Sequence, residues 1–494
     1  MLLRGRSIRK ESGVLMHISS LPSAYCIGSL GIKAYDFIDF LSKANQRYWQ
    51  ILPLCPIGEG NSPYKSYSAF AGEILFIDLH FLVRDGYLQK EDLPEDEDFK
   101  KTDYKKAKQI KLPLLKKAAD NFDVSKSDYK RFIKENEDWL EPYSLFMAIK
   151  EKNNDKSFDK FPDGLKYRLP VAITEFKEEN SERIQFYKIT QYLFFKQYFA
   201  LKNYASMKHI KIIGDIPFYV SFDSADVWEN PEVFRLGRDM TPVQVAGVPP
   251  DIFSKEGQLW GNPIYDWDLQ KKTNYLWWRK RLIHSLSLYD VLRIDHFRAF
   301  ADYYTIAFGS KNAKTGRWEK GAGLPFWKSM QNYIGSGRII AEDLGGETPE
   351  VEKLVKDIGF PNMKVLQFAF DSDLQNKFLP RNYNPNCVCY TGTHDNDTTV
   401  SWYEKSNQKE KIIFEKIVPK DRLSSPCHRL IKYGMNSVAK LVIIPIQDYL
   451  CLGSEYRMNT PGTEKGNWEY RLDPSVLNKE LIEKIKYLTK GRNK

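Results

Sequence analysis

Short apolar runs recur along the chain, and each is closed by a polar or turn-forming residue. This pattern is typical of buried parallel strands. The gaps between the later runs are long enough for helices, and Val351 to Ile358 places its apolar residues on one helix face. Phe326 to Ile334 is predicted to form another helix. The predicted strands are residues 13–19, 47–54, 210–217, 289–295, 338–343, 364–370, 387–393 and 441–447.

Strands that alternate with helices favour a parallel α/β sheet, and about eight of them favour closure into a (β/α)8 TIM barrel. Such a barrel needs only about 250 residues, whereas the chain has 494. We therefore predict a single catalytic barrel domain over residues 1–494 with two large insertions. One lies between strands two and three, at about 55–205, and is helix-rich. The other lies between strands three and four, at about 218–288, and its prolines and glycines predict long ordered loops around a substrate cleft.

The formal net charge of +10 does not by itself indicate a nucleic-acid or membrane partner, because the basic residues are spread along the chain. The densest group of lysines, within residues 100–117, alternates with apolar residues. It is interpreted as a solvated helical face, with an anionic partner as the alternative. No run approaches the roughly 20 apolar residues of a membrane span. Six scattered cysteines favour a reducing, cytoplasmic setting, and Cys387 and Cys389 are predicted to pack in the core of one strand.

Acidic residues stand where several predicted strands end. Taken singly, each could be a helix N-cap or a paired surface acid. A parallel barrel, however, gathers its strand ends on one face, where acids distant in sequence meet. Arg293 lies two residues before Asp295, so both side chains would point the same way from a strand and the arginine could orient the carboxylate. The acids at strand ends are Asp215, Asp295, Glu342, Asp395 and Asp448.

Carboxylates grouped in this way, with aromatic residues and a histidine between them, indicate chemistry on a sugar. Retaining glycoside chemistry needs two carboxyl groups roughly 5–5.5 Å apart, one as nucleophile and one as general acid. A third carboxylate that binds sugar hydroxyls more tightly in the transition state would add to catalysis. The acids form no recognisable metal-ligand cluster and no Gly-rich phosphate loop is present, so neither a metal nor an organic cofactor is expected.

Distinctive segments extend this picture over nearly the whole chain, from about Gly13 to Arg471. Together they resemble the 4-alpha-glucanotransferases of glycoside hydrolase family 77, known as amylomaltases in bacteria and disproportionating enzymes in plants. Besides the segments around Asp295, Glu342 and Asp395, they are His17-Ile18-Ser19-Ser20-Leu21-Pro22, Asn61-Ser62-Pro63-Tyr64, Gly214-Asp215-Ile216-Pro217, Gly247-Val248-Pro249-Pro250-Asp251, Gly257-Gln258-Leu259-Trp260-Gly261-Asn262-Pro263 and Asn459-Thr460-Pro461-Gly462-Thr463.

The resemblance implies a role for each matching residue. Asp295 would be the nucleophile that forms a β-glucosyl enzyme intermediate, Glu342 the general acid and then base, and Asp395 the stabiliser of the distorted sugar. Arg293 would position the nucleophile, and His394 would hydrogen-bond the sugar beside the broken bond. The further implied glucan contacts are Tyr64, Asp251, Trp260, Asn262 and His296. The implied substrates are α-1,4-glucans, such as maltooligosaccharides and amylose, together with glucose.

Some of these assignments have simpler alternatives. Tyr64 and Trp260 could be loop anchors, and Asp251 could fix a turn after two prolines. The chain departs from the family at Ile252, where an aromatic residue is common, and at Ser29, where Asp is usual. For the whole chain, the rival functions are an amylase-type hydrolase, which would use the same three acids with water as acceptor, and a non-catalytic glucan-binding barrel. Oligomeric state does not follow from the sequence.

Overall fold

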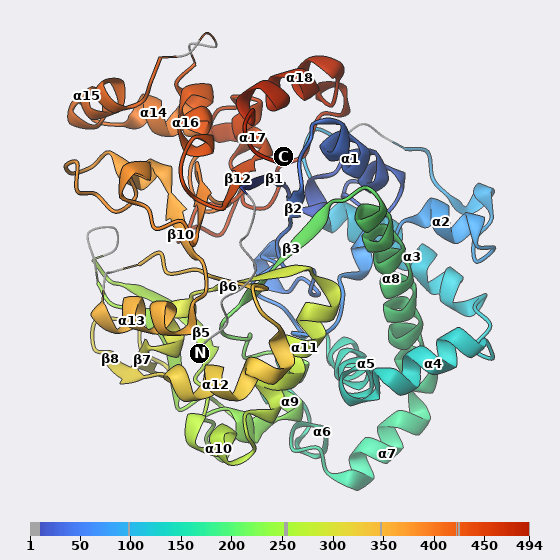
Figure 1. Cartoon of the computed structure of the whole chain (residues 1–494). Helices are drawn as coiled ribbons and strands as arrows, with labels where there is room; N and C mark the ends of the chain where they lie inside the picture. Colours follow the sequence, from blue (N-terminus) through green and yellow to red (C-terminus); the bar gives the residue numbers. More distant parts are fainter. Residues whose placement is uncertain are drawn as a thin grey trace.

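Eight parallel strands close into a barrel in the computed structural model of the chain, which describes residues 10–96, 99–250, 255–345, 348–420, 422 and 425–493. Around the barrel the strands follow the order β1-β12-β11-β10-β9-β6-β3-β2. Figure 1 shows this barrel at the centre of the molecule. Its strands are β1 (Glu11–Leu15), β2 (Tyr48–Gln50), β3 (Lys211–Pro217), β6 (Val291–Asp295), β9 (Ile339–Ala341), β10 (Asn362–Val365), β11 (Cys387–Tyr390) and β12 (Leu441–Pro445).

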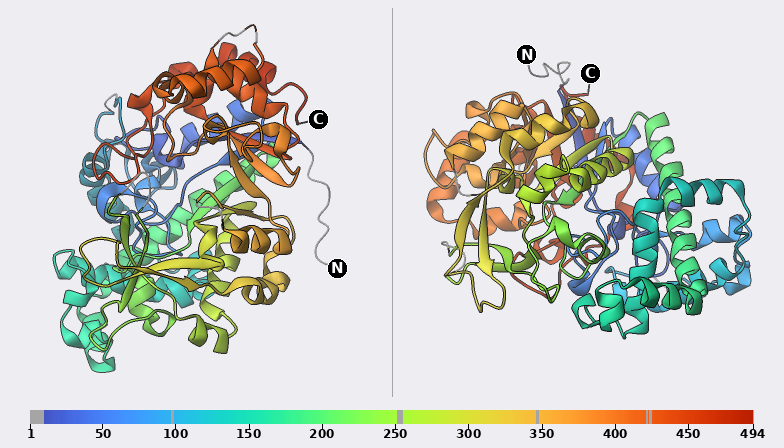
Figure 2. Two further views of the ribbon diagram at one scale, coloured as in Figure 1. Left: turned by 90° about the vertical axis from the view of Figure 1, so that its left-hand side faces the viewer. Right: turned by 90° about the horizontal axis from the view of Figure 1, so that it is seen from below.

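Helices surround the barrel, and a group of them packs to one side, where α8 contacts α3, α4 and α5 (Figures 1 and 2). The helices are α1 (Ile32–Lys43), α2 (Leu79–Arg84), α3 (Tyr104–Asp120), α4 (Ser127–Glu135), α5 (Glu137–Lys152), α6 (Asp163–Lys166), α7 (Pro170–Glu179), α8 (Ser181–Met207), α9 (Ala225–Glu229), α10 (Trp267–Lys272), α11 (Leu276–Leu288), α12 (Gly323–Ile334), α13 (Pro349–Ile358), α14 (Thr399–Lys405), α15 (Gln408–Ile417), α16 (Pro426–Met435), α17 (Ile446–Tyr449) and α18 (Lys479–Leu488).

The barrel prediction is confirmed, and each predicted strand overlaps one observed strand. Six of the predicted strands extend past the observed C-terminal ends, however, whereas those over 210–217 and 289–295 end where β3 and β6 do. Residues 366–369 form a short 3-10 helix rather than strand, and the strand predicted at 338–343 already ends at Ala341. The residues that follow the observed ends of these strands begin the loops that form the site. Both predicted helices are confirmed, within α12 and α13.

A second, antiparallel sheet lies beside the barrel and was not expected from the sequence. Its strands are β4 (Gln244–Val248), β5 (Gln258–Pro263), β7 (Asp302–Ala307) and β8 (Arg317–Lys320), in the order β5-β4-β7-β8. The sequence predicts long ordered loops over 218–288, whereas the structure forms strands and helices there as well. Prolines and glycines interrupt the sequence pattern by which these short strands could have been predicted. In addition, β4 pairs with β7, which follows β6 in the chain, so the pairing is not between neighbouring elements of the sequence. The sheet carries Trp260 and Asn262 of the predicted site.

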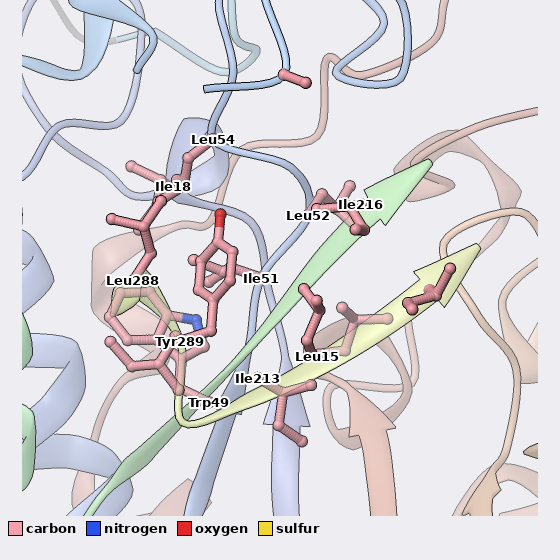
Figure 3. Packing of buried hydrophobic residues seen from close by; sticks show 14 of the residues in the cluster. Leu15, Ile18, Trp49, Ile51, Leu52, Leu54, Ile213, Ile216, Leu288 and Tyr289 are labelled. Carbon is pink, nitrogen blue, oxygen red and sulfur yellow. The ribbon is translucent and has the colours of Figure 1, made fainter. Parts of the chain in front are cut away.

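Large apolar side chains from β1, β2 and β3 pack in the barrel region shown in Figure 3. Trp49 on β2 is buried and donates its indole N–H to the backbone oxygen of Met16 at 2.7 Å. Tyr289, just before β6, packs directly over Gly214 of β3, so that a Cβ at this glycine would lie 2.1 Å from the ring. This close approach lets β3 and β6 lie side by side with Asp215 opposite Arg293.

The paired cysteines and the lysine-rich segment, both interpreted from the sequence, have defined positions in the structure. Cys387 and Cys389 are buried in β11, as predicted. The lysine-rich segment forms α3, but the interpretation as a wholly solvated face is wrong for Lys111. Its side chain is buried and donates to the backbone oxygen of Leu75 at 2.5 Å. Among the described helices, none is long and apolar enough to cross a membrane.

Candidate active site

Arg293 joins two carboxylates at the end of the barrel where β3 and β6 finish. Its Nη1 donates to Asp215 Oδ2 at 2.6 Å, and its Nη2 donates to Asp295 Oδ1 at 2.9 Å. The alternation of side chains along β6 places Arg293 and Asp295 on the same face, as predicted, and the β3–β6 register brings Asp215 opposite Arg293. Arg293 and Asp215 are buried, whereas the Asp295 side chain is 30% exposed. The arginine thus fixes a carboxylate that a ligand can still reach.

Glu342 follows the neighbouring strand β9 and accepts two backbone hydrogen bonds. The N–H of His296 donates to Oε2 and the N–H of Leu344 to Oε1, both at 2.7 Å. His296 adopts a left-handed backbone conformation with φ of 51°, directly after Asp295. Burial, together with the negative charge of Asp295, raises the pKa of Glu342 above the usual range of a glutamate. Glu342 therefore keeps its proton at a higher pH than an exposed glutamate would, as a general acid requires.

Asp395 lies in the segment that follows β11 and is held by the C-terminal part of the chain. Asn459 Nδ2 donates to its Oδ1 at 2.6 Å, and Arg457 donates to its backbone oxygen at 2.5 Å. His394 Nε2 lies 3.4 Å from the other carboxylate oxygen. The side chain of Asp395 is 42% exposed, so these contacts orient the carboxylate without covering it.

Tyr64 connects the arginine network to the Asp395 segment. Its hydroxyl donates to Asp215 Oδ2 at 2.8 Å, and its ring stacks on His394 with a centroid distance of 5.1 Å. Trp468 packs at 5.9 Å from both rings. Burial lowers the pKa of His394, so this histidine is a neutral hydrogen-bonding group near neutral pH.

Trp260 lies on β5 of the antiparallel sheet. Its ring meets His296 edge-on at 4.8 Å, and burial lowers the pKa of His296 to about 4. Asn262 donates through Nδ2 to the backbone oxygen of Val220 at 2.8 Å. This bond anchors the Asn262 side chain to the loop backbone at Val220, as a residue that fixes a loop would do. Asp251 and Ile252 lie outside the described residues.

The structure brings most of the predicted site residues together. Arg293 donates to Asp295, and the backbone N–H of His296 donates to Glu342. Tyr64 connects His394 to the arginine network, because its ring stacks on His394 and its hydroxyl shares Asp215 with Arg293. Asp215 was singled out as an acid at a strand end but not as a site residue, and it proves to be the hydrogen-bond partner of both Arg293 and Tyr64.

Other residues of the site were missed or wrongly grouped. Asn459 and Trp468 were not predicted as site residues, although the segment from Asn459 to Thr463 was noted. Asp448, grouped with the acids at strand ends, belongs instead to α17. It is buried and accepts hydrogen bonds from Thr391 and Thr399, so its role is to hold the segment between them.

The chemistry available to this arrangement is that of carboxylic acids. It offers a partly exposed carboxylate on an arginine, a buried carboxyl with a raised pKa beside it, and a third carboxylate with a neutral histidine. Within the described residues, no group of three or more His, Cys, Asp or Glu side chains could hold a metal ion.

Known proteins resemble this chain over nearly its full length. The family model described as 4-alpha-glucanotransferase, Glyco_hydro_77, matches residues 16–477. A 4-alpha-glucanotransferase of Clostridium butyricum is 46% identical, covering 96% of this chain and 99% of its own. A second, of Thermus thermophilus, is 44% identical and covers 95% and 96%. The solved structure of the amylomaltase from Streptococcus agalactiae in complex with acarbose has 38% identity and a TM-score of 0.94, covering 98% of this chain and 99% of that one.

Proposed function

The chain belongs to the 4-alpha-glucanotransferase family, glycoside hydrolase family 77, and is an enzyme with that activity; on this premise we propose that it works by the retaining route through a covalent intermediate on Asp295. The observation that carries the proposal is the pairing of Asp295 and Glu342. One carboxylate is accessible and held by Arg293, and the other has a raised pKa. These are the properties of a nucleophile and a general acid, respectively.

In the first step, an oxygen of Asp295 attacks the anomeric carbon of an α-1,4-glucan. Glu342 gives its proton to the glycosidic oxygen, and the leaving glucan departs with a free 4-hydroxyl group. In the second step, the Glu342 carboxylate takes the proton from the 4-hydroxyl of another glucan or of glucose. That oxygen attacks the same carbon, and Asp295 is released. Two inversions at one carbon retain its configuration.

The other site residues would bind and distort the sugar. Asp395 would accept hydrogen bonds from hydroxyl groups of the sugar next to the broken bond, and His394 and His296 would contribute neutral hydrogen-bonding groups. Arg293 would keep the nucleophile aligned. We also retain Tyr64, Trp260, Asn262 and Asp251 as proposed glucan contacts. The free cysteines are compatible with a cytoplasmic location, which remains a prediction.

Incubation with maltotriose tests the activity. Transfer yields glucose and longer maltodextrins without a net rise in reducing ends, because each bond broken is replaced by another. An amylase-type hydrolase would raise reducing ends steadily, and a binding protein would leave maltotriose unchanged.

The covalent route needs its own experiment. In Glu342→Gln, transfer between maltotriose molecules should fall by at least about 10²-fold, because the leaving oxygen receives no proton. Maltotriosyl fluoride needs no such proton and should still load the variant, giving a glucanosyl adduct on the peptide with Asp295 in mass spectrometry. The double variant with Asp295→Ala is the matched control and should carry no adduct. Undiminished turnover by Glu342→Gln, or an adduct on another residue, would remove this mechanism.

A further inference from the structure

Cys427 and Cys451 have side chains in contact with each other, in the region where α16 packs against α17 (Figure 1). The Cys427 sulfur and the backbone N–H of Cys451 both reach the backbone oxygen of Asp448, at 3.0 and 3.2 Å. Cys427 is the second residue of α16 and is fully buried, whereas Cys451 follows α17 and is partly exposed. The Cys451 sulfur lies 3.2 Å from His428 Nε2 and 3.5 Å from Ser425 Oγ. Cys427 donates its S–H to the backbone oxygen of Asp448 at 3.0 Å. The mechanism of glucan transfer uses none of these side chains.

The surroundings of Cys451 favour its thiolate. Contacts with the side chains of Cys427, then His428 and Ser425, lower the pKa of the Cys451 thiol to about 4, despite partial burial. Cys55 is a useful contrast, because it is also partly exposed but burial raises its pKa to about 12. A thiolate that a small molecule can reach, with a second thiol beside it, is the arrangement that oxidants modify most readily.

We propose that Cys451 and Cys427 form a peroxide-sensitive thiol pair that closes to a disulfide. The Cys451 thiolate attacks one oxygen of hydrogen peroxide, the O–O bond breaks, and the released hydroxide takes up a proton to form water. Cys451 then carries a sulfenic acid. The sulfur of Cys427 attacks it, the S–O bond breaks, and the hydroxide leaves with the Cys427 proton as a second water. Two thiols are oxidised and one peroxide is reduced.

The disulfide would act on the site through Asp448. Cys427 would lose the S–H that it donates to the Asp448 backbone. The Asp448 carboxylate accepts hydrogen bonds from Thr391 at 2.5 Å and from the backbone and hydroxyl of Thr399 at 2.8 and 2.7 Å. These two threonines flank the segment that carries His394 and Asp395. Oxidation is therefore expected to lower the transfer rate several-fold, and reduction to restore it.

Peptide mapping of the intact enzyme tests the pair directly. After a few equivalents of hydrogen peroxide, a peptide linking Cys427 to Cys451 is expected, which disappears on treatment with dithiothreitol. Before oxidation, iodoacetamide should alkylate Cys451 at least about ten-fold faster than Cys55 near pH 6.5. Unlinked Cys427 and Cys451 after peroxide treatment, or alkylation of Cys451 no faster than that of Cys55, would overturn the proposal.

Two variants separate the chemistry from its effect on activity. Cys427→Ser should leave a sulfenic acid on Cys451 that dimedone traps. Because this variant forms no disulfide, its transfer rate should not show the several-fold loss that peroxide causes in the wild type. Cys55→Ser is the matched control and should still form the link. A wild-type enzyme that forms the disulfide with its transfer rate unchanged would overturn the coupling to the site. This readout is independent of the covalent route, because the link is detected without any glucan.

Discussion

The pKa of Glu342 is set by its neighbour Asp295 as well as by its own burial. Both raise it, and each acts by disfavouring the charged form. Replacing Asp295 by Asn removes the negative charge but keeps the shape, so the pKa of Glu342 should fall while burial holds it above that of an exposed glutamate. Titration of the labelled Glu342 carboxyl by 13C NMR measures this change. Asp373→Asn, at an exposed site, is the control, and an unchanged pKa in Asp295→Asn would contradict the assignment of a charge-coupled pair.

The same raised pKa predicts how the stability depends on pH. A group whose pKa is higher in the folded state favours folding below its unfolded value of about 4.3, and this contribution is lost as the pH rises through the folded value. Glu342→Gln mimics the protonated form at every pH. The variant should therefore be more stable than the wild type at pH 9, by on the order of 2 kcal/mol, and the difference should shrink at pH 5. Urea unfolding at both pH values measures this difference in stability. A difference that does not depend on pH would contradict the raised pKa of Glu342 in the folded protein.

Sequence reasoning reached some of these residues and missed others for physical reasons. Arg293 and Asp295 share a strand, so the alternation of side chains alone places them on one face. Asp215 reaches Arg293 from another strand, and its meaning depends on the β3–β6 register, which no local pattern specifies. Asn459 reaches Asp395 from still farther along the chain. Contacts of this kind were accessible only through the resemblance to a family.

At the level of elements, β3 requires a residue without a side chain at one position. The ring of Tyr289 occupies the space over Gly214, and the ring atoms nearest to it belong to a buried side chain. Gly214→Ala should therefore force a shift in the packing of β3 against the segment before β6 and destabilise the protein by about 1–3 kcal/mol. Urea unfolding measures the loss.

Gly345→Ala provides a matched control for this prediction, because a Cβ at Gly345 meets no atom within 4 Å. It should leave the free energy of unfolding within about 0.5 kcal/mol of the wild type. Since Gly214 precedes Asp215, the Gly214→Ala variant should also lower the transfer rate in its folded form. Equal stability of the two variants would show that the Tyr289 ring can move aside.

The elements themselves were predictable where their patterns are strong. Barrel strands are buried on both faces, so they appear as continuous apolar runs, and α13 shows a clear apolar face. The antiparallel sheet is different. Its outer strand β8 is largely exposed and β5 only partly buried, and β4 pairs with β7 across the intervening β6. Neither apolar runs nor spacing could therefore have indicated it. Some strand ends were placed too late because apolar residues continue past them, as Ile51, Leu366 and Ile446 do after β2, β10 and β12.

For the whole molecule, closure of the barrel brings the first and last strands together. β1 pairs with β12, and residues near the C-terminus then pack against β1. Asn493 accepts from the backbone N–H of Ser12 at 2.8 Å and donates to Ser12 Oγ and to the Asn45 backbone oxygen, both at 2.7 Å. All three bonds are largely buried. They tie the chain end to the base of the barrel, far from the strand ends that carry the site.

Removal of this tie should destabilise the whole barrel without altering the chemistry of the folded enzyme. Asn493 has a φ of 60°, so Asn493→Gly removes the amide while keeping a residue that accepts this conformation. The buried N–H of Ser12 then loses its partner, and a loss of about 1–3 kcal/mol is expected. Asn154→Gly is the matched control, because Asn154 has a φ of 55° but is exposed. Urea unfolding followed by both fluorescence and transfer activity should show one shared midpoint, lowered only in Asn493→Gly, with an unchanged rate in water. A transfer rate that falls while the unfolding midpoint stays in place would show that the chain end acts on the site rather than on the fold.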